Sequence, residues 1–314
     1  MYTGSLKQVP ARTSAACPAA NSPALAQLTH PIPASLQDSA RSWLAEGQGP
    51  ERKAKLAAAT VFVRDGKQGP EAYMTYRYKS PLGRLAFPGG LAVAQDFDPV
   101  PWSNPNAVCW AKAFDREDLG QAQALVVTAV REVFEETGIL LASREGEACS
   151  LDAASTQKCM VTRQRIASQE KSFSDYLSQR GFKIQADLLK PLARWQSPDF
   201  YHKRYDMHYF AAALPVGQSP TLLEGKGVWG GWVPARQVVE NPLSLALGDE
   251  IDQPDTRGVP FQELVAPGVM CLLRELAASS SSVAFLSKRR QVTLTRSQVE
   301  QDASGTCYLT LNPS

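Results

Sequence analysis

The clearest hydrophobic pattern in the chain lies near its middle. Val126, Val130, Val133 and Thr137 recur at helical spacing and form a stripe that can face a core. Gly138 follows the last turn, where a helix commonly ends in the left-handed conformation that glycine tolerates. The pattern therefore predicts one helix that ends at this glycine and returns the chain to the body of the protein.

The remaining apolar runs predict further strands and helices. Runs with period two, or short continuous apolar runs, indicate strands, and runs with a period near 3.6 indicate helices. We expect strands at residues 57–63, 72–78, 187–195, 205–215 and 228–233, and a C-terminal hairpin around 291–295 and 306–311. We expect helices at residues 35–44, 163–179, 235–240 and 267–278.

Composition divides the chain into three parts. Residues 1–34 are rich in Ala, Pro, Ser and Thr, which predicts a disordered N-terminal arm. Residues 35–278 carry the alternating strands and helices of one large domain, interrupted by a proline-rich and tryptophan-rich insertion at 91–122. Such an insertion is either a lid that governs specificity or a cap on the fold. Residues 279–314 form a C-terminal β extension.

Charge and cysteine usage exclude several classes of protein. The 33 basic and 31 acidic residues give no general case for binding nucleic acid or a membrane surface. The six cysteines are scattered, and neither they nor the three histidines form a zinc pattern. No apolar run is long enough to span a bilayer. Free thiols in a reducing compartment are the default, so we expect a cytoplasmic protein.

Three glutamates on the central helix are the first candidate for chemistry. Glu132, Glu135 and Glu136 stand at i, i+3 and i+4 and share one face. Like charges at this spacing repel each other, and a hard divalent cation such as Mg²⁺ would remove that penalty. On spacing alone, a solvated acidic face with Arg131 as partner is the commoner arrangement.

A glycine-rich segment upstream favours the metal site. Phe87-Pro88-Gly89-Gly90 predicts a strand end whose backbone can approach a ligand closely. This segment, together with Arg131-Glu132-Val133-Phe134-Glu135-Glu136-Thr137-Gly138-Ile139, resembles the sequence box of the Nudix hydrolases. The resemblance implies an α/β fold with a mixed sheet between helices.

Two features of this chain depart from the family's box. Residues 91–122 separate its two halves, where the family has a short loop. Gln123 stands at the position of the box's earlier glutamate, so that acidic ligand is missing. A neutral amide can still reach a metal or water through its carbonyl oxygen. The alternative is that the insertion has moved position 123 away from the site.

The resemblance implies a set of site residues. Glu132, Glu135, Glu136 and a carbonyl of Gly89 or Gly90 would hold Mg²⁺ or Mn²⁺, and Arg131 would orient the carboxylates. The catalytic base would be Glu132 or Glu224, which lies in a later loop. The reaction would be hydrolysis of the diphosphate in a small-molecule nucleoside diphosphate derivative.

A finer resemblance concerns the substrate. Residues 79–90, Trp195-Gln196-Ser197-Pro198 and Arg204-Tyr205-Asp206 resemble segments of the Nudix branch that cleaves coenzyme A, and of its bacterial relatives. Coenzyme A or an acyl derivative is therefore the expected substrate. Arg77, Lys79 and Arg84 are candidate phosphate-binding cations. The alternative, which the sequence favours equally, is that they are ordinary surface charges. ADP-ribose, another nucleotide sugar, or a binding module without catalysis are the alternatives. The sequence leaves a homodimer open.

Overall fold

A computed structural model describes residues 28–47, 53–78, 80, 82–149, 157–224 and 227–311 of the chain. Its centre is a mixed sheet in the order β1-β12-β11-β8-β9-β2-β3-β10, with β4 beside β3 and β5 beside β2. A separate pair, β6 and β7, lies outside it. The strands are β1 (Leu28–Pro31), β2 (Lys55–Gly66), β3 (Gly69–Tyr76), β4 (Leu85–Ala86), β5 (Gly89–Leu91), β6 (Ala142–Ser143), β7 (Lys183–Ile184), β8 (Lys190–Gln196), β9 (Tyr205–Ala213), β10 (Gly230–Pro234), β11 (Leu294–Gln301) and β12 (Cys307–Leu311).

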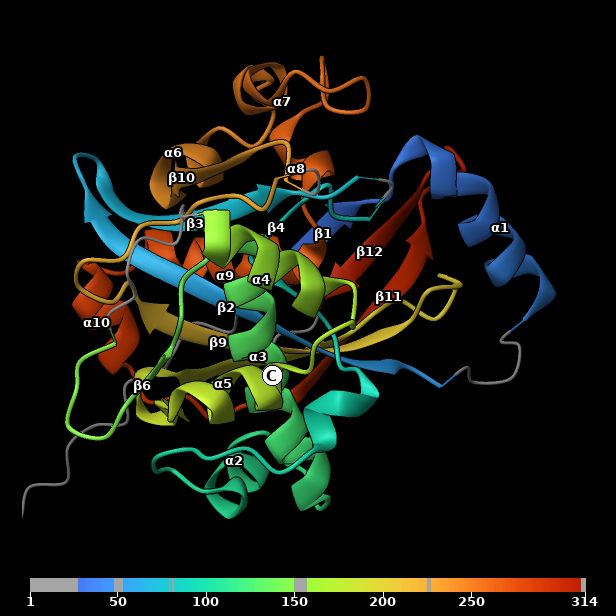
Figure 1. The fold of residues 1–314 in the computed structure, drawn as a ribbon. Helices are drawn as coiled ribbons and strands as arrows, with labels where there is room; N and C mark the ends of the chain where they lie inside the picture. Colours follow the sequence, from blue (N-terminus) through green and yellow to red (C-terminus); the bar gives the residue numbers. More distant parts are fainter. Residues whose placement is uncertain are drawn as a thin grey trace, which may run out of the picture.

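Helices cover both faces of this sheet, as expected for the α/β class (Figure 1). The α-helices are α1 (Gln37–Glu46), α2 (Ala107–Ala113), α3 (Leu119–Thr137), α4 (Gln157–Ala167), α5 (Phe173–Arg180), α6 (Ala235–Glu240), α7 (Ala246–Ile251), α8 (Phe261–Leu264), α9 (Pro267–Ala277) and α10 (Ser282–Ser287). Short 3₁₀ turns are η1 (Ala34–Leu36), η2 (Ala94–Phe97) and η3 (Ala186–Leu188). In the part of the chain that the structure describes, no helix is long and apolar enough to cross a membrane.

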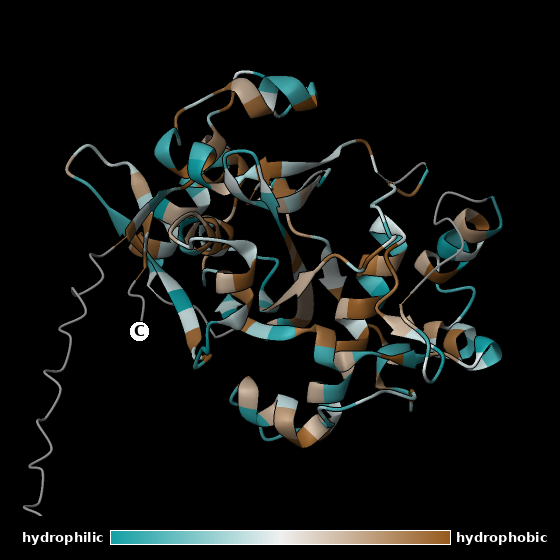
Figure 2. Cartoon of the chain, turned by 90° about the vertical axis from the view of Figure 1, so that its left-hand side faces the viewer, coloured by the Kyte–Doolittle hydropathy of each residue, from teal (hydrophilic) through white to brown (hydrophobic). Residues whose placement is uncertain are grey.

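Strand β2 shows how the two layers arise. Ala58 and Phe62 pack with α2, α3 and α5, whereas Ala59, Val61 and Val63 pack with α8, α9 and α10 on the opposite face. Because side chains alternate across a strand, a run that is apolar at nearly every position is buried on both sides. Figure 2 shows the hydrophobic segments gathered where the helices meet the sheet.

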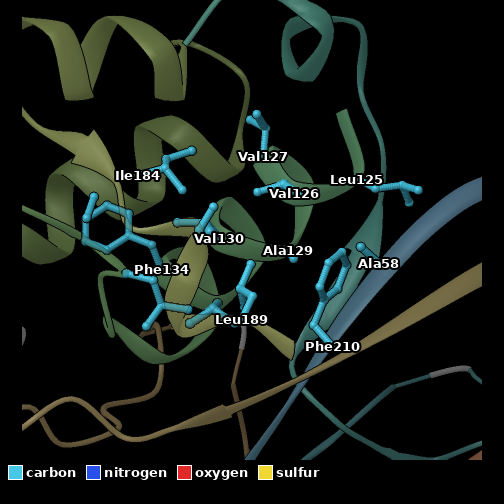
Figure 3. Close-up of a cluster of buried hydrophobic side chains, with 14 of the residues drawn as sticks. Ala58, Leu125, Val126, Val127, Ala129, Val130, Phe134, Ile184, Leu189 and Phe210 are labelled. Carbon is cyan, nitrogen blue, oxygen red and sulfur yellow. The ribbon is translucent and has the colours of Figure 1, made fainter. Parts of the chain in front are cut away.

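Helix α3 is the central element of the first layer. It is buried along most of its length, and its side chains pack toward Ala58 and Phe210 of the sheet (Figure 3). Phe134, one turn from its end, faces Leu189 and Ile184. Gly138 ends the helix with a φ of 72°, as the sequence predicts. This packing fixes the axis of the helix and hence the direction of its acidic face.

Several segments differ from the sequence prediction. The strand expected at 187–195 begins only at Lys190, after η3, and the hairpin strand expected around 291–295 runs from Leu294 to Gln301. Residues 163–179 form parts of two helices, α4 and α5, because Gln169 takes a φ of 60° and Ser172 caps a new helix by accepting from the Asp175 amide. Residues 28–34, expected in the disordered arm, form β1 and the start of η1, because β1 completes its backbone hydrogen bonds on β12. Residues 1–27 of the arm lie outside the described residues.

The C-terminal segment carries the expected hairpin. β11 and β12 pair antiparallel through a turn at residues 302–306, and α10 precedes them. β11 continues the sheet by pairing in parallel with β8, and α1 packs against the hairpin. Figure 1 shows α1, β11 and β12 together at one side of the molecule. The two ends of the described chain thus extend the same sheet.

The insertion at residues 91–122 is part of the core. It contains η2, α2 and the first turn of α3, and its Trp110 and Phe114 are buried against Phe210 of β9. Part of the insertion therefore caps the fold, and its role in specificity stays a prediction. Removing the insertion would expose the sheet.

A polar cluster attaches this insertion to the sheet. Arg116 donates to Asp206 and, through Nε, to Nε2 of His208 at 2.9 Å. Arg194 also donates to both carboxylate oxygens of Asp206, at 3.0 and 3.1 Å. Burial opposes ionisation of Asp206, but the Arg194 hydrogen bond and the neighbouring positive charges hold its pKa below the ordinary value. Burial lowers the pKa of His208 to about 3, so it is neutral and accepts from Arg116.

We predict that Asp206→Asn lowers the free energy of unfolding by about 3 kcal/mol, because it leaves two half-buried guanidinium groups without their carboxylate. Urea unfolding at neutral pH measures the change. The stability that Asp206 contributes is present above its ordinary pKa of 3.8 and is lost as pH falls through its lower folded value, so the difference should shrink in acid. Asp252→Asn, which breaks an exposed pair with Arg257, is the control. Equal urea midpoints for the parent and Asp206→Asn would contradict this account.

Candidate active site

Arg131 is the centre of the site. Its side chain is 7% exposed and donates through Nε and Nη2 to both carboxylate oxygens of Asp96, at 2.8 and 2.9 Å. Its Nη1 donates to Glu132 at 2.9 Å and to Glu135 at 2.7 Å, and Nη2 also reaches the Leu91 carbonyl at 2.9 Å. Burial disfavours the charge, but the Asp96 hydrogen bond and the surrounding carboxylates raise the pKa of Arg131 above its ordinary value. The guanidinium therefore joins three segments of the chain.

Asp96 is a site residue that the sequence analysis missed. It is 1% exposed, comes from η2 in the insertion, and also accepts from the Thr128 hydroxyl at 2.8 Å. The inserted residues that divide the motif follow Asp96, so this acid keeps its spacing from Gly90, whereas Gln123 has the corresponding spacing from Arg131. The spacing from Gly90 is the sequence signal that identifies Asp96.

Gln123 lies away from the carboxylates. Its amide donates to the Asp98 carbonyl at 3.1 Å and so holds the insertion to the start of α3. It is not among the residues that line the acidic pocket described below. Of the two alternatives for position 123, the structure supports displacement from the site.

Arg77 is the second cation of the site. It follows β3 and donates from Nη1 and Nη2 to both carboxylate oxygens of Glu136. Nη2 also donates to the Gly89 carbonyl at 2.7 Å and to the Phe87 carbonyl at 3.2 Å. The expected phosphate-binding arginine thus lies at the acidic face of α3, between the helix and the glycine-rich segment.

The glycines bring β5 close to both β2 and α3. A Cβ at Gly89 would overlap Ala58 and Ala59 of β2, and a Cβ at Gly90 would overlap the Glu132 carboxylate. Glycine is therefore required at position 89, where the β2 backbone is in the way, whereas a side chain at position 90 would displace the Glu132 carboxylate. The sequence expectation of close backbone approach at these glycines agrees with this geometry.

A cavity of about 510 Å³ opens on this cluster and is called the acidic pocket. Glutamates, arginines and parts of the insertion form its wall: Arg77, Leu91, Val93, Gln95, Arg131, Glu132, Glu135 and Glu136. Burial raises the pKa of Glu136 to about 7; Arg77 opposes this shift, and Glu132 and Glu135 add to it. The pocket therefore concentrates negative charge that one more cation would stabilise.

The donor set fits a hard divalent cation. Three carboxylates line one pocket whose Arg77 also binds the Gly89 carbonyl, and Mg²⁺ and Mn²⁺ prefer such oxygen ligands. In the described residues, the glutamates are bonded to Arg131 and Arg77, and no three acidic, His or Cys side chains are grouped so as to hold a metal. The oxygen ligands that such a cation needs are thus present, and in this structure they accept hydrogen bonds from arginines.

The other candidate residues lie apart from the pocket wall. Arg84 pairs with Asp255 at 3.3 Å, and the Tyr76 hydroxyl donates to the same carboxylate. Arg84 lines neither the acidic pocket nor the second cavity described below. Glu224 is exposed in a turn whose neighbours Leu222 and Leu223 line the acidic pocket. Lys79 lies outside the described residues.

A second cavity of about 260 Å³, called the apolar pocket, adjoins the first. Arg77 and Leu91 line both cavities. Arg77 is the one charged side chain among the described residues that line the apolar pocket. Its other walls come from the segment that runs into β5, from Trp195–Pro198 and the aromatic residues of β9, and from the start of α9. The residues of the first segment that line it are Ser80, Leu82, Gly83, Ala86, Phe87, Gly89 and Gly90. The lining of the apolar pocket is thus suited to an uncharged group next to Arg77.

Buried Arg163 completes the end of α3. Its guanidinium is fully buried and donates to the Glu135 carbonyl at 3.0 Å and the Thr221 carbonyl at 2.7 Å. The Thr221 amide in turn donates to the Thr137 carbonyl at 2.7 Å. Helix ends leave carbonyls without intrahelical partners, and here a cation and a loop amide satisfy them. The loop that lines the acidic pocket is thereby fixed to the helix that carries the glutamates.

Comparison with known proteins identifies the fold. No family model and no curated protein matches the chain. Among solved structures, a Nudix hydrolase from Alicyclobacillus acidocaldarius matches at 24% identity and a TM-score of 0.56, over 76% of this chain and 98% of that one. A UDP-X diphosphatase matches at 10% identity and a TM-score of 0.33, over 80% and 71%. The Nudix domain of Shewanella oneidensis NrtR, complexed with ADP ribose, matches at 12% and 0.31, over 74% and 93%. The fold of this chain is the Nudix fold.

We predict that Asp96→Asn lowers kcat/KM by at least about tenfold and the unfolding free energy by about 3 kcal/mol, because Arg131 loses the charged partner that sets its position. Steady-state kinetics and urea unfolding measure both. Gln123→Glu is the matched control, since it adds an acid at the position that lies outside the pocket; its metal titration should superimpose on that of the parent. A tighter metal titration for Gln123→Glu, together with an unchanged Asp96→Asn enzyme, would reverse the two assignments.

Proposed function

We propose that this protein is a metal-dependent Nudix hydrolase that cleaves the diphosphate of a nucleoside diphosphate derivative. The observation that carries the proposal is the convergence of Glu132, Glu135 and Glu136 with Arg77 on one pocket. A solvated acidic face would leave these carboxylates in water, whereas here two arginines and a buried aspartate organise them. Keeping three repelling carboxylates in a pocket is costly for a module that only binds nucleotides.

Mg²⁺ or Mn²⁺ would be held by Glu132, Glu135, Glu136 and a carbonyl of Gly89 or Gly90. When bound, it would neutralise phosphate charge and lower the pKa of a coordinated water. The chain's own residues do the rest. Arg131 keeps Glu132 and Glu135 in position, and its bonds to Asp96 keep it from moving into the pocket.

Glu132 is the base that we assign. It lines the acidic pocket beside Gly90, whereas Glu224 is exposed and outside the wall. Glu132 would accept a proton from the water that attacks phosphorus. The bond from that phosphorus to the bridging oxygen then breaks, and the second phosphate leaves. Arg77 would stabilise the charge that develops on the phosphate oxygens.

The substrate that we propose is coenzyme A or an acyl derivative. Gly83, Phe87, Gly89 and Gly90, together with Trp195–Pro198, belong to the segments that resemble coenzyme A-cleaving enzymes, and they line the apolar pocket next to Arg77. The uncharged wall suits the part of the substrate beyond its diphosphate. ADP-ribose and nucleotide sugars carry a polar sugar at that place, and they are the competing substrates in the test.

We predict that Glu135→Gln and Glu136→Gln each lower Mg²⁺- or Mn²⁺-supported turnover by about a hundredfold or more, because loss of one ligand removes several kcal/mol of transition-state stabilisation. Coenzyme A, acetyl-coenzyme A, ADP-ribose and UDP-glucose, each assayed with either metal, provide the substrate panel, and chromatography separates the two phosphomonoesters that cleavage of the diphosphate produces. Glu147→Gln, an exposed glutamate far along the next loop, is the control.

Two outcomes would contradict the proposal. Parental rates for both glutamine variants would remove the metal assignment. Equilibrium binding of a nucleotide with no turnover under either metal would indicate a sensing module instead. The same assay on Glu224→Gln decides between the candidate bases, and we expect it to retain turnover at saturating metal.

A further inference from the structure

The bonding of Arg77 suggests a role beyond contact with substrate. Both carboxylate oxygens of Glu136 accept from its guanidinium, and Nη2 is shared with the Gly89 carbonyl at 2.7 Å. The proposed metal ligands include these same oxygens. A guanidinium and a divalent cation repel each other, and the Arg77 fork already uses a lone pair on each Glu136 oxygen and on the Gly89 carbonyl, so a cation bound at these oxygens competes with Arg77.

Arg131 shares this conflict only in part. Three of its five hydrogen bonds go to Asp96 and the Leu91 carbonyl, which are outside the proposed ligand set, and a single nitrogen reaches Glu132 and Glu135. Its side chain is 7% exposed, against 28% for Arg77. Arg131 can therefore stay in place while a cation binds, but Arg77 has to leave its carboxylate.

We propose that Arg77 is an internal counter-cation of the acidic pocket. It holds Glu136 and the Gly89 carbonyl until a divalent cation displaces it, and the released guanidinium then binds a phosphate of the substrate. This inference rests on the metal site of the proposed function. Arg77 lines both the acidic and the apolar pocket, so a turn of its side chain keeps it within the region where a diphosphate would lie. Its planar fork suits phosphate oxygens as well as a carboxylate.

The displacement of Arg77 couples the binding of the metal to the binding of the substrate. A cation that has to displace Arg77 binds with an apparent affinity reduced by the fraction of molecules in which the arginine is already released. A phosphate that holds the released arginine removes this cost. Metal and substrate therefore tighten each other's binding by the same factor. The sign of the effect of removing Arg77 distinguishes a competitor from a residue that merely orients the ligands.

The test measures Mn²⁺ binding to the full chain in the absence of substrate. The electron paramagnetic resonance signal of free Mn²⁺ reports how much of the metal remains unbound. We expect Arg77→Gln to bind Mn²⁺ about fivefold more tightly than the parent, which corresponds to about 1 kcal/mol. High-salt buffer screens the general effect of deleting a positive charge. Arg84→Gln makes the same charge change in a residue that pairs with Asp255 and lines neither pocket. The Mn²⁺ affinity of this control should therefore stay within about twofold of the parent.

A second readout uses the substrate side. At saturating Mn²⁺, Arg77→Gln should raise KM for the diphosphate substrate, since the phosphate loses its arginine. Arg77→Lys tests the same idea if the glutamine variant fails to fold: a single ammonium cannot span both Glu136 oxygens and the Gly89 carbonyl, so Mn²⁺ should again bind more tightly than in the parent.

Weaker or unchanged Mn²⁺ binding in a folded Arg77 variant, with normal binding in the parent, would overturn the inference alone. Absence of Mn²⁺ binding from both the parent and the Arg77 variants would overturn the proposed metal site and the inference with it. Binding that appears only when Arg77 is replaced would support the inference most strongly.

Discussion

The site depends on one buried guanidinium. Arg131 gives up its hydration, and its charge is tolerable only because Asp96, Glu132 and Glu135 all accept from it. These partners come from separate parts of the chain, the insertion and the central helix, and the Leu91 carbonyl adds the end of β5. A charge network of this kind fixes relative positions, since no partner can move without leaving another charge unpaired.

The rest of the structure supports this network from outside. The packing of α3 on the sheet sets the direction of the glutamates, and the burial of Trp110 and Phe114 brings the insertion, with Asp96, against the same helix. At the other end, Arg163 and Thr221 satisfy the last carbonyls of α3 and attach the loop that closes the acidic pocket. The insertion interrupts the sequence of the glycine–helix motif but not its spatial arrangement, because it enters and leaves beside the residues that it separates.

Local patterns predicted the elements but not the contacts between distant segments. The helical stripe at Val126, Val130 and Val133 and the continuous apolar run of β2 follow from burial, so periodicity is enough to find them. Asp96 could not be recognised in the same way, since a single buried acid in an insertion has no periodic signal. Arg84 shows the converse. Its place in the sequence suggests phosphate binding, but its guanidinium forms an ion pair with Asp255, which comes from a loop far along the chain. The break between α4 and α5 depends on one left-handed residue, which apolar spacing does not reveal.

The central claim is that the divided motif closes into a single metal site around Arg131. A crystal structure of the protein soaked in Mn²⁺, with anomalous diffraction to locate the ion, tests it most directly. Our account predicts an anomalous peak in the acidic pocket bound by Glu132, Glu135 and Glu136, with Arg131 still paired to Asp96. A peak elsewhere, or an ion that binds only when Arg131 has left Asp96, would contradict it.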